Sequence, residues 1–164
     1  MTTLLTQFKN LASANTLRSM WGYLKGMPAG GVLMGRIIGQ MAPYTGTIRP
    51  EILALEPGYA KVRMADRRRV RNHLSSVHAI ALMTLGEVAT GTAMLVSVPD
   101  GSRSIITKLS MEYLKKARGP ITAECTCGVP DSNERREYQV TADLKNEAGD
   151  VVARATATWL VGPA

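Results

Sequence analysis

Apolar positions recur at helical spacing in the first quarter of the chain. The stripe that they form predicts an amphipathic helix over residues 3–25, and its interspersed polar side chains do not fit a secretory signal. A turn rich in glycine follows at 26–31. A shorter apolar run over 32–41 predicts a second helix, and Pro43 is expected to end it.

The pattern then changes to an alternation of apolar and polar residues. It predicts a hairpin of strands at 46–56 and 59–66, joined by a Pro-Gly turn. Because Pro50 has no N–H to donate, we expect the first strand to lie at a sheet edge or to carry a bulge. The following residues, 67–76, are polar and basic and are expected to form a loop.

The middle of the chain predicts one long helix. Residues 77–96 are rich in Ala and Leu and apolar nearly all round, so we expect this helix to be enclosed. Four strand-like runs joined by short turns follow, at 103–114, 120–129, 135–145 and 151–161. This order predicts an α+β fold in which a long antiparallel sheet wraps around one central helix, with further helices at the N-terminus.

Charge adds the expectation of an anionic partner. The chain has 164 residues, enough for one domain with a real core, and a net charge of +7 from 20 Lys and Arg against 13 Asp and Glu. Basic residues cluster at 67–71 and at 115–118. The chain has one Phe, and aromatic residues that could stack on bases do not accompany either cluster, which argues against nucleic acid. Solvated loops are the alternative interpretation of both clusters.

No transmembrane segment, metal site or disulfide is expected. Residues 77–98 are long enough to span a bilayer but contain Glu87 and His78, so a buried helix in a soluble, cytoplasmic protein is the better interpretation. Cys125 and Cys127 lie two apart in a predicted strand, where side chains share a face and the backbone is too short for an easy disulfide. We interpret them as small core residues in a reducing compartment.

Glu87 is the anomaly in the predicted helix. Only two of the 26 residues from Leu74 to Pro99 are ionisable, His78 and Glu87. A lone carboxylate in an enclosed helix is costly unless it is paired, hydrogen-bonded or protonated. Desolvation raises the pKa of such a group, which suits a general base or acid near neutral pH. The alternative is that Glu87 points to an exposed stripe or to a solvated dimer seam.

The approach to this helix carries polar groups that fit an oxyanion site. Ser75 or Ser76 is expected to cap the helix, whose first N–H groups lack partners within it. These donors and the side chain of Asn72 can together stabilise a developing oxyanion, although simple capping of the loop is an equal alternative. Glu87 lies roughly 12 Å along the helix from its start. Two antiparallel helices at a twofold interface would bring the two groups together, which predicts an isologous dimer.

Asn72, followed by His78-Ala79 and then Glu87, resembles a motif of the hotdog-fold acyl-CoA thioesterases of the phenylacetate-degradation type. The resemblance covers about residues 45–162 and implies a hotdog domain at 44–164 behind an N-terminal helical extension at 1–43. It implies that Asn72 and the N–H of Ala79 polarise the thioester carbonyl and that His78 shapes the loop. Glu87 of the partner chain would activate water or attack the carbonyl.

The same resemblance implies the substrate and its contacts. The substrate would be an acyl thioester of CoA or of an acyl carrier protein, with no separate cofactor, bound by a homodimer or a tetramer. This chain departs from the family where Ala79 replaces the common Gly and Glu87 the commoner Asp. Thr107 lies near a family hydroxyl position, although Ile106 is an alternative for that place. The residues expected to contact substrate are His73, Thr90, Thr107, Lys115, Lys116 and Arg118.

Two other functions fit the sequence. Hotdog hydroxyacyl dehydratases place an active His fourteen residues before a helical Glu, as His73 precedes Glu87, but their Pro- and Gly-rich loop is absent here. A non-catalytic acyl- or lipid-binding protein would use the same tunnel, because fold alone does not establish catalysis. The sequence leaves the acyl chain, its carrier and the role of the N-terminal helices open.

Overall fold

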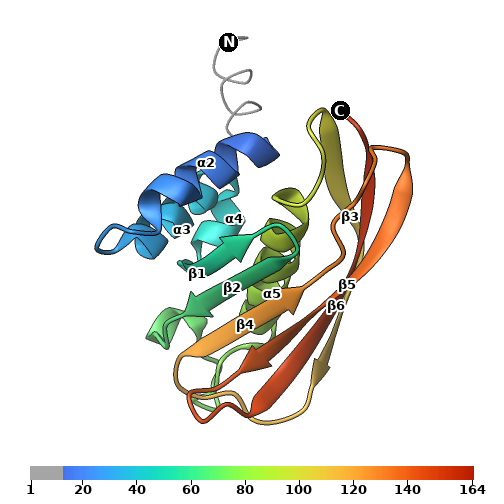
Figure 1. Cartoon of the computed structure of the whole chain (residues 1–164). Helices are drawn as coiled ribbons and strands as arrows, with labels where there is room; N and C mark the ends of the chain where they lie inside the picture. Colours follow the sequence, from blue (N-terminus) through green and yellow to red (C-terminus); the bar gives the residue numbers. More distant parts are fainter. Residues whose placement is uncertain (1–12) are drawn as a thin grey trace.

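The computed structural model describes residues 13–164, so the part of the predicted helix 3–25 before Ser13 lies outside the described residues. Four α-helices, one short 3₁₀ helix and six strands make up this part of the chain (Figure 1). The elements are α2 (Ala14–Leu24), α3 (Gly30–Met41), α4 (Pro43–Gly46), β1 (Glu51–Glu56), β2 (Tyr59–Met64), η1 (Arg68–Val70), α5 (Ala79–Leu95), β3 (Ser102–Tyr113), β4 (Ile121–Thr126), β5 (Arg136–Lys145) and β6 (Val151–Pro163).

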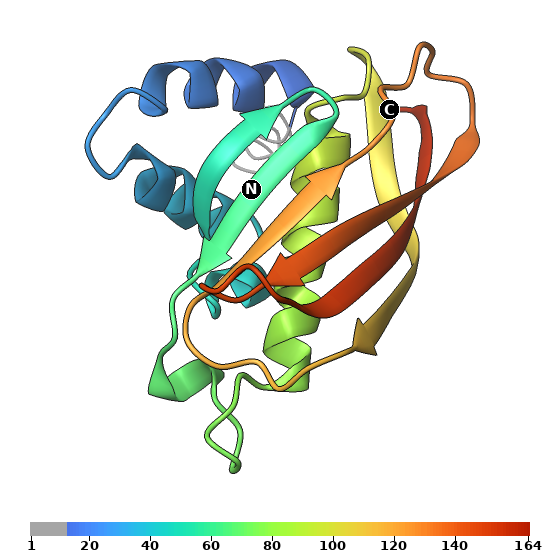
Figure 2. The same cartoon turned by 60° about the horizontal axis from the view of Figure 1, so that its bottom comes forward.

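The six strands form one antiparallel sheet in the order β1-β2-β4-β5-β6-β3. The sheet curves around α5, and α2, α3 and α4 lie beyond β1 (Figures 1 and 2). Alternate side chains of β2, β4, β5 and β6 are buried. The predicted α+β hotdog architecture, an antiparallel sheet around one long central helix, is therefore confirmed.

The first predicted strand begins later than expected. Residues 46–50 do not form strand, because α4 runs to Gly46 and Arg49 has a positive φ of 49°. Pro50 stands just ahead of β1, which is an edge strand and has an irregular register between Ile52 and Ala54. Pro50 therefore predicted the edge position correctly. The predicted strand, however, began too early, at residue 46.

The central helix fits against the sheet through its small residues. At Gly86, a Cβ atom would lie 2.5 Å from the Cβ of Ala155 on β6, so only glycine allows this approach. Buried threonines satisfy their hydroxyl groups within the helix, as in the 2.6 Å hydrogen bond from Thr92 to the Val88 carbonyl. A nearly apolar helix can therefore lie inside the sheet without unsatisfied polar groups along most of its length.

The two edges of the sheet differ in how they are covered. Helix α3 packs on β1 so closely that a Cβ at Gly31 would lie 2.1 Å from the Ile52 carbonyl oxygen, and one at Gly35 would lie 1.7 Å from that of Pro50. At the opposite edge, β3 pairs with β6 alone, and among the described residues no further strand pairs with its outer side. An edge strand of this length presents unpaired backbone groups that favour pairing with another chain.

The N-terminal helices share the core of the sheet. Leu17, Trp21, Leu24 and Met34 are buried in the same cluster as the inner residues of the strands. The predicted boundary between an extension at 1–43 and a domain at 44–164 stays a prediction. Within residues 13–164, no helix is long and apolar enough to cross a membrane. Cys125 is fully buried, Cys127 is partly buried, and both thiols are free.

Candidate active site

One stripe along α5 is left partly uncovered. Ile80 is 46% exposed, and Met83, Glu87, Gly91 and Leu95 are partly exposed, while most of the other residues of the helix are buried. These five residues recur every three or four positions and so lie on one face of the helix. The prediction of an enclosed helix is correct except for this stripe, and Glu87 stands in its middle.

Glu87 is an unpaired carboxylate in a desolvated place. In the part of the chain that the structure describes, no hydrogen bond or ion pair reaches its side chain. Burial raises the pKa of Glu87 above its ordinary value. Glu124 gives the contrast, because hydrogen bonds from Tyr59 and Lys145 lower the pKa of that carboxyl to about 2. A carboxyl group with these properties is a candidate for proton transfer or for attack on a substrate.

Trp159 lies beside Glu87 and was missed by the sequence analysis. A Cβ at Gly91 would lie 3.0 Å from two carbons of the Trp159 ring and 3.6 Å from Oε1 of Glu87, so ring and carboxylate flank the same point. The indole Nε1 is buried and has no hydrogen-bond partner within residues 13–164. The sequence showed Trp159 only as a large residue on the buried face of a predicted strand. Such a residue is normally interpreted as part of the core.

The helix start offers a free backbone donor. His78, not Ser75 or Ser76, caps α5: its Nδ1 accepts a 3.1 Å hydrogen bond from the N–H of Ile80. The N–H of Ala79 has no partner within the described chain, and Ala79 is exposed. Tyr113 at the end of β3 donates a hydrogen bond of 3.1 Å to the Ala79 carbonyl and so fixes this turn. Tyr113 carried no signal in the sequence.

Asn72 both builds the preceding loop and keeps a donor free. Its Oδ1 accepts hydrogen bonds from the N–H groups of Leu74 and Ser76, at 2.9 and 3.1 Å. Because the side-chain oxygen is held by these two donors, the amide nitrogen Nδ2 must point away from the loop backbone. Asn72 therefore caps the loop, and its NH₂ group has no partner among the described residues.

Two distant loops flank the start of α5. The N–H of His78 donates to the Val70 carbonyl at 2.8 Å, and the N–H of Val77 donates to the Ala117 carbonyl at 2.9 Å. The two basic clusters of the sequence therefore meet around the helix N-terminus, which itself favours anions. Lys115 forms an ion pair with Asp150 at 3.0 Å. The exposed basic side chains that remain beside the helix start are Arg68, Arg69, Lys116 and Arg118.

Three other predicted substrate contacts do not join this group. His73 is exposed on the loop, and no hydrogen bond connects it to Glu87 in the described chain. Thr90 is fully buried, and its hydroxyl donates to the carbonyls of Gly86 and Glu87. Thr107 is exposed at a bulge of β3, and its hydroxyl donates a hydrogen bond to the Thr158 carbonyl.

The bulge explains the place of Thr107. The register of β3 against β6 shifts between Ile106 and Lys108, so the partly buried positions change from Ile106 to Leu109 and Met111. Ile106, the alternative for this place, is therefore the residue that packs against the core. A pattern of strict alternation cannot reveal such a shift, because one extra residue reverses the faces of all that follow.

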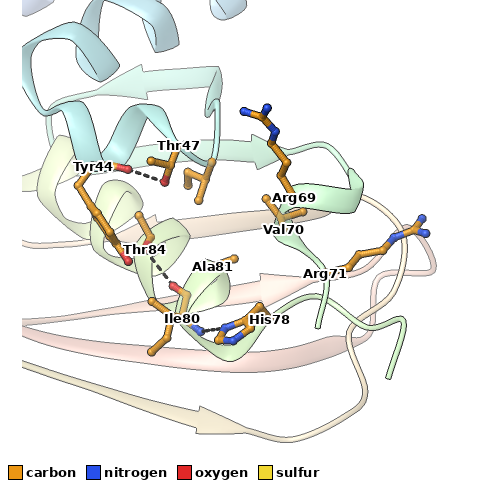
Figure 3. A pocket seen from close by; sticks show the side chains of 10 residues that line it. Tyr44, Thr47, Arg69, Val70, Arg71, His78, Ile80, Ala81 and Thr84 are labelled. Atoms are coloured by element: carbon orange, nitrogen blue, oxygen red, sulfur yellow. Dashed lines mark hydrogen bonds between the residues drawn. The ribbon is translucent and has the colours of Figure 1, made fainter. Parts of the chain in front are cut away.

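A pocket opens next to the helix start (Figure 3). It has a volume of about 660 Å³ and lies between α4 and the first two turns of α5. Within residues 13–164, no group of three or more His, Cys, Asp or Glu side chains lies close enough together to hold a metal ion. The chemistry available is that of a carboxylate, backbone and amide donors, and a basic rim formed by Arg68, Arg69, Lys116 and Arg118.

Burial of Glu87 predicts a pH-dependent stability. A carboxyl whose pKa is raised by folding stabilises the folded state below its ordinary pKa, and this contribution is lost as the pH rises through the raised value. Wild type should therefore lose stability relative to Glu87→Gln as the pH rises from 4 to 8. Urea unfolding of both proteins across this range measures the difference. A difference that stays constant with pH would contradict the raised pKa.

The comparisons with known proteins identify the family and agree with the fold. A family model described as "Domain of unknown function (DUF4442)" matches residues 30–161. The crystal structure of a structural-genomics protein, APC5556, is 36% identical, with 90% of this chain and 98% of that one covered and a TM-score of 0.78. A probable thioesterase from Pseudomonas aeruginosa is 22% identical, with 86% and 99% covered and a TM-score of 0.72. No curated protein matches the sequence.

The predicted resemblance is also present among the solved structures. A variant of the phenylacetic acid degradation protein PaaI from Thermus thermophilus is 21% identical, with 72% of this chain and 97% of that chain covered and a TM-score of 0.62. At these identities, the likeness to the thioesterases shows the fold.

Proposed function

We propose that this protein, which belongs to the DUF4442 family, is a hydrolase of acyl thioesters carried by CoA or by an acyl carrier protein. The observation that supports the proposal most is the unpaired carboxylate of Glu87 on the uncovered stripe of α5. Likeness of the fold to proteins named as thioesterases agrees with it. The free thiols and a CoA substrate both suit a reducing, cytoplasmic compartment.

Each proposed site combines two protomers. Glu87 and Ala79 lie on one helix, separated by eight residues or roughly 12 Å, too far apart for one small carbonyl group. A second copy of the chain would cover the uncovered stripe of α5 and could pair with the open edge of β3. In an isologous dimer, Glu87 of each protomer would face the helix start of the other, and both sites would be equivalent.

The proposed reaction uses the groups already described. The ionised Glu87 takes a proton from water, whose oxygen attacks the thioester carbonyl carbon. Negative charge that develops on the carbonyl oxygen is stabilised by the N–H of Ala79 and the NH₂ of Asn72, while His78 keeps the turn in place. Collapse of the tetrahedral intermediate breaks the C–S bond. The proton held by Glu87 then goes to the leaving thiolate, and direct attack by Glu87 is the alternative first step.

The basic rim would bind the anionic carrier of the acyl group. Phosphate groups of CoA, or acidic residues of an acyl carrier protein, would contact exposed Lys116 and Arg118 and the arginines of η1. Lys115 contributes less, because Asp150 already neutralises it. A dehydratase that uses His73 would also have to combine residues of two protomers, so the products of turnover distinguish it from a hydrolase.

Asn72→Asp tests the proposed donor without removing the loop cap. The new carboxylate keeps an oxygen for the N–H groups of Leu74 and Ser76 but lacks the NH₂ group. We expect the variant to fold and to lose about 10²–10³-fold in kcat, as when one oxyanion donor is removed. Asn146→Asp is the control, because Asn146 also accepts a backbone N–H in a turn, while its NH₂ group donates to Asp150 at 3.4 Å outside the proposed site. Normal turnover by Asn72→Asp would remove Asn72 from the mechanism.

The activity itself is tested with a panel of acyl-CoAs of short, long and aromatic acyl groups, followed by release of free thiol. Turnover of at least one substrate supports the hydrolase. If the purified protein retains an acyl ligand but hydrolyses none of the panel, the proposal fails and a non-catalytic acyl-binding protein takes its place. Formation or hydration of an acyl double bond in place of thiol release would instead identify a dehydratase or hydratase.

A further inference from the structure

The pocket beside α5 has a wall that comes from outside the sheet and its central helix. Tyr44, at the second position of α4, reaches across to Ile80 and Thr84 on α5 (Figure 3). Ile48, in the segment between α4 and β1, lines the pocket as well. The volume of about 660 Å³ lies within the range of roughly 300–1,000 Å³ typical of small-ligand sites.

The interior of this pocket is apolar in effect. Its two threonine hydroxyls are already engaged, since Thr47 donates to the Tyr44 carbonyl at 2.6 Å and Thr84 donates to the Ile80 carbonyl at 2.9 Å. The guanidinium groups of Arg69 and Arg71 point away from it (Figure 3). The side chains left for a ligand are mainly hydrocarbon, with the imidazole of His78 and the exposed ring of Tyr44 beside them.

The mouth of the pocket opens at the free backbone donor. His78 and Ile80 both line the pocket, and Ala79 lies between them in the first turn of α5. A ligand whose carbonyl oxygen accepts from the N–H of Ala79 can therefore place the apolar group attached to that carbonyl into the pocket. The same N–H of Ala79 belongs to the proposed site, so the pocket and the proposed site adjoin there.

We infer that this pocket binds the acyl group of the substrate, and that α4 and the segment after it set which acyl groups are accepted. The inference rests on the proposed function and deepens it: the substrate is an acyl thioester with a medium-length or longer apolar acyl group. The pantetheine arm of the carrier suits this interior less well than an apolar acyl group, because its amides would lie mainly against hydrocarbon there. Its place is along the basic rim.

Two variants at opposite walls test the inference. Ala81 is nearly buried and lines the pocket, so Ala81→Leu fills part of it, and Tyr44→Ala removes the aromatic wall. We expect each to lower kcat/KM for dodecanoyl-CoA about tenfold relative to kcat/KM for butanoyl-CoA. Tyr23→Ala, which removes an exposed tyrosine of α2 outside the pocket, should leave this ratio unchanged.

The outcomes separate this inference from the proposed function. An equal loss for every chain length, an unchanged ratio, or the same change of ratio in Tyr23→Ala would overturn the acyl assignment while hydrolysis itself still stands. If the wild type hydrolyses no acyl-CoA, the proposed function fails. Calorimetric titration with dodecanoic acid then tests whether the pocket binds an apolar chain. Binding that Ala81→Leu weakens about tenfold and Tyr23→Ala does not supports the apolar site, and equal binding by all three proteins overturns it.

Discussion

Replacement of Glu87 by Gln is expected to lower kcat for acyl-CoA hydrolysis by about 10²–10⁴-fold. The substitution keeps the size and shape of the side chain and removes only the ability to take a proton. A nucleophilic role predicts a still larger loss, because the amide cannot attack the carbonyl. Rates of thiol release at saturating substrate measure the effect, with the melting temperature as evidence that the variant is folded.

The controls for Glu87→Gln separate catalysis from folding. The variant should be at least as stable as the wild type above neutral pH, because burial raises the pKa of Glu87 and so disfavours its charged form. Glu134→Gln changes an exposed glutamate of the loop before β5 and should leave kcat unchanged. A folded Glu87→Gln protein with normal turnover would end the proposed mechanism.

Mixed dimers test whether the site is shared between protomers. Asn72→Asp and Glu87→Gln subunits should each be nearly inactive alone. After unfolding and joint refolding, half of randomly paired dimers would contain both, and each would have one site with Asn72 and Glu87 intact, so about a quarter of wild-type activity should return. A site built within a single chain would give no recovery on mixing.

Gly35→Ala is expected to be the most destabilising of the glycine substitutions in α3. Its Cβ would lie 1.7 Å from the Pro50 carbonyl oxygen, a backbone atom just ahead of β1 that cannot turn aside like a flexible side chain. The helix must therefore move away from the sheet edge and lose contacts along its length. We expect a loss of about 3 kcal/mol in the free energy of unfolding, at the upper end of overpacking effects.

Gly22→Ala is the matched control for Gly35→Ala. Gly22 lies inside α2, and a Cβ there would meet no atom within 4 Å. Without a clash, alanine should stabilise the protein by about 0.5–1 kcal/mol through its better helix propensity. Urea unfolding of both variants measures the two changes in the free energy of unfolding, which should have opposite signs. Equal effects at the two positions would contradict the close approach of α3 to β1.

The sequence by itself determined the kinds and order of the strands and of the longer helices. Alternation in the strands and the Ala- and Leu-rich composition of residues 79–95 are local, so each was recognisable without its partners. The isolation of Glu87 was equally plain, because a single carboxylate among apolar neighbours needs no structure to be noticed. Local patterns failed where a local rule had exceptions: His78 caps α5 in place of a serine, and a bulge turns Thr107 outward.

Only the tertiary structure decided what surrounds Glu87. How much of α5 the sheet covers depends on the curvature and order of all the strands, so the uncovered stripe cannot be recognised in the helix itself. The pocket at Tyr44 depends on the packing of α4 against α5. The basic loops at 67–71 and 115–118 meet at the helix start because strands from different parts of the chain end there. Periodicity states which face of an element is buried, but it does not state which distant segment buries it.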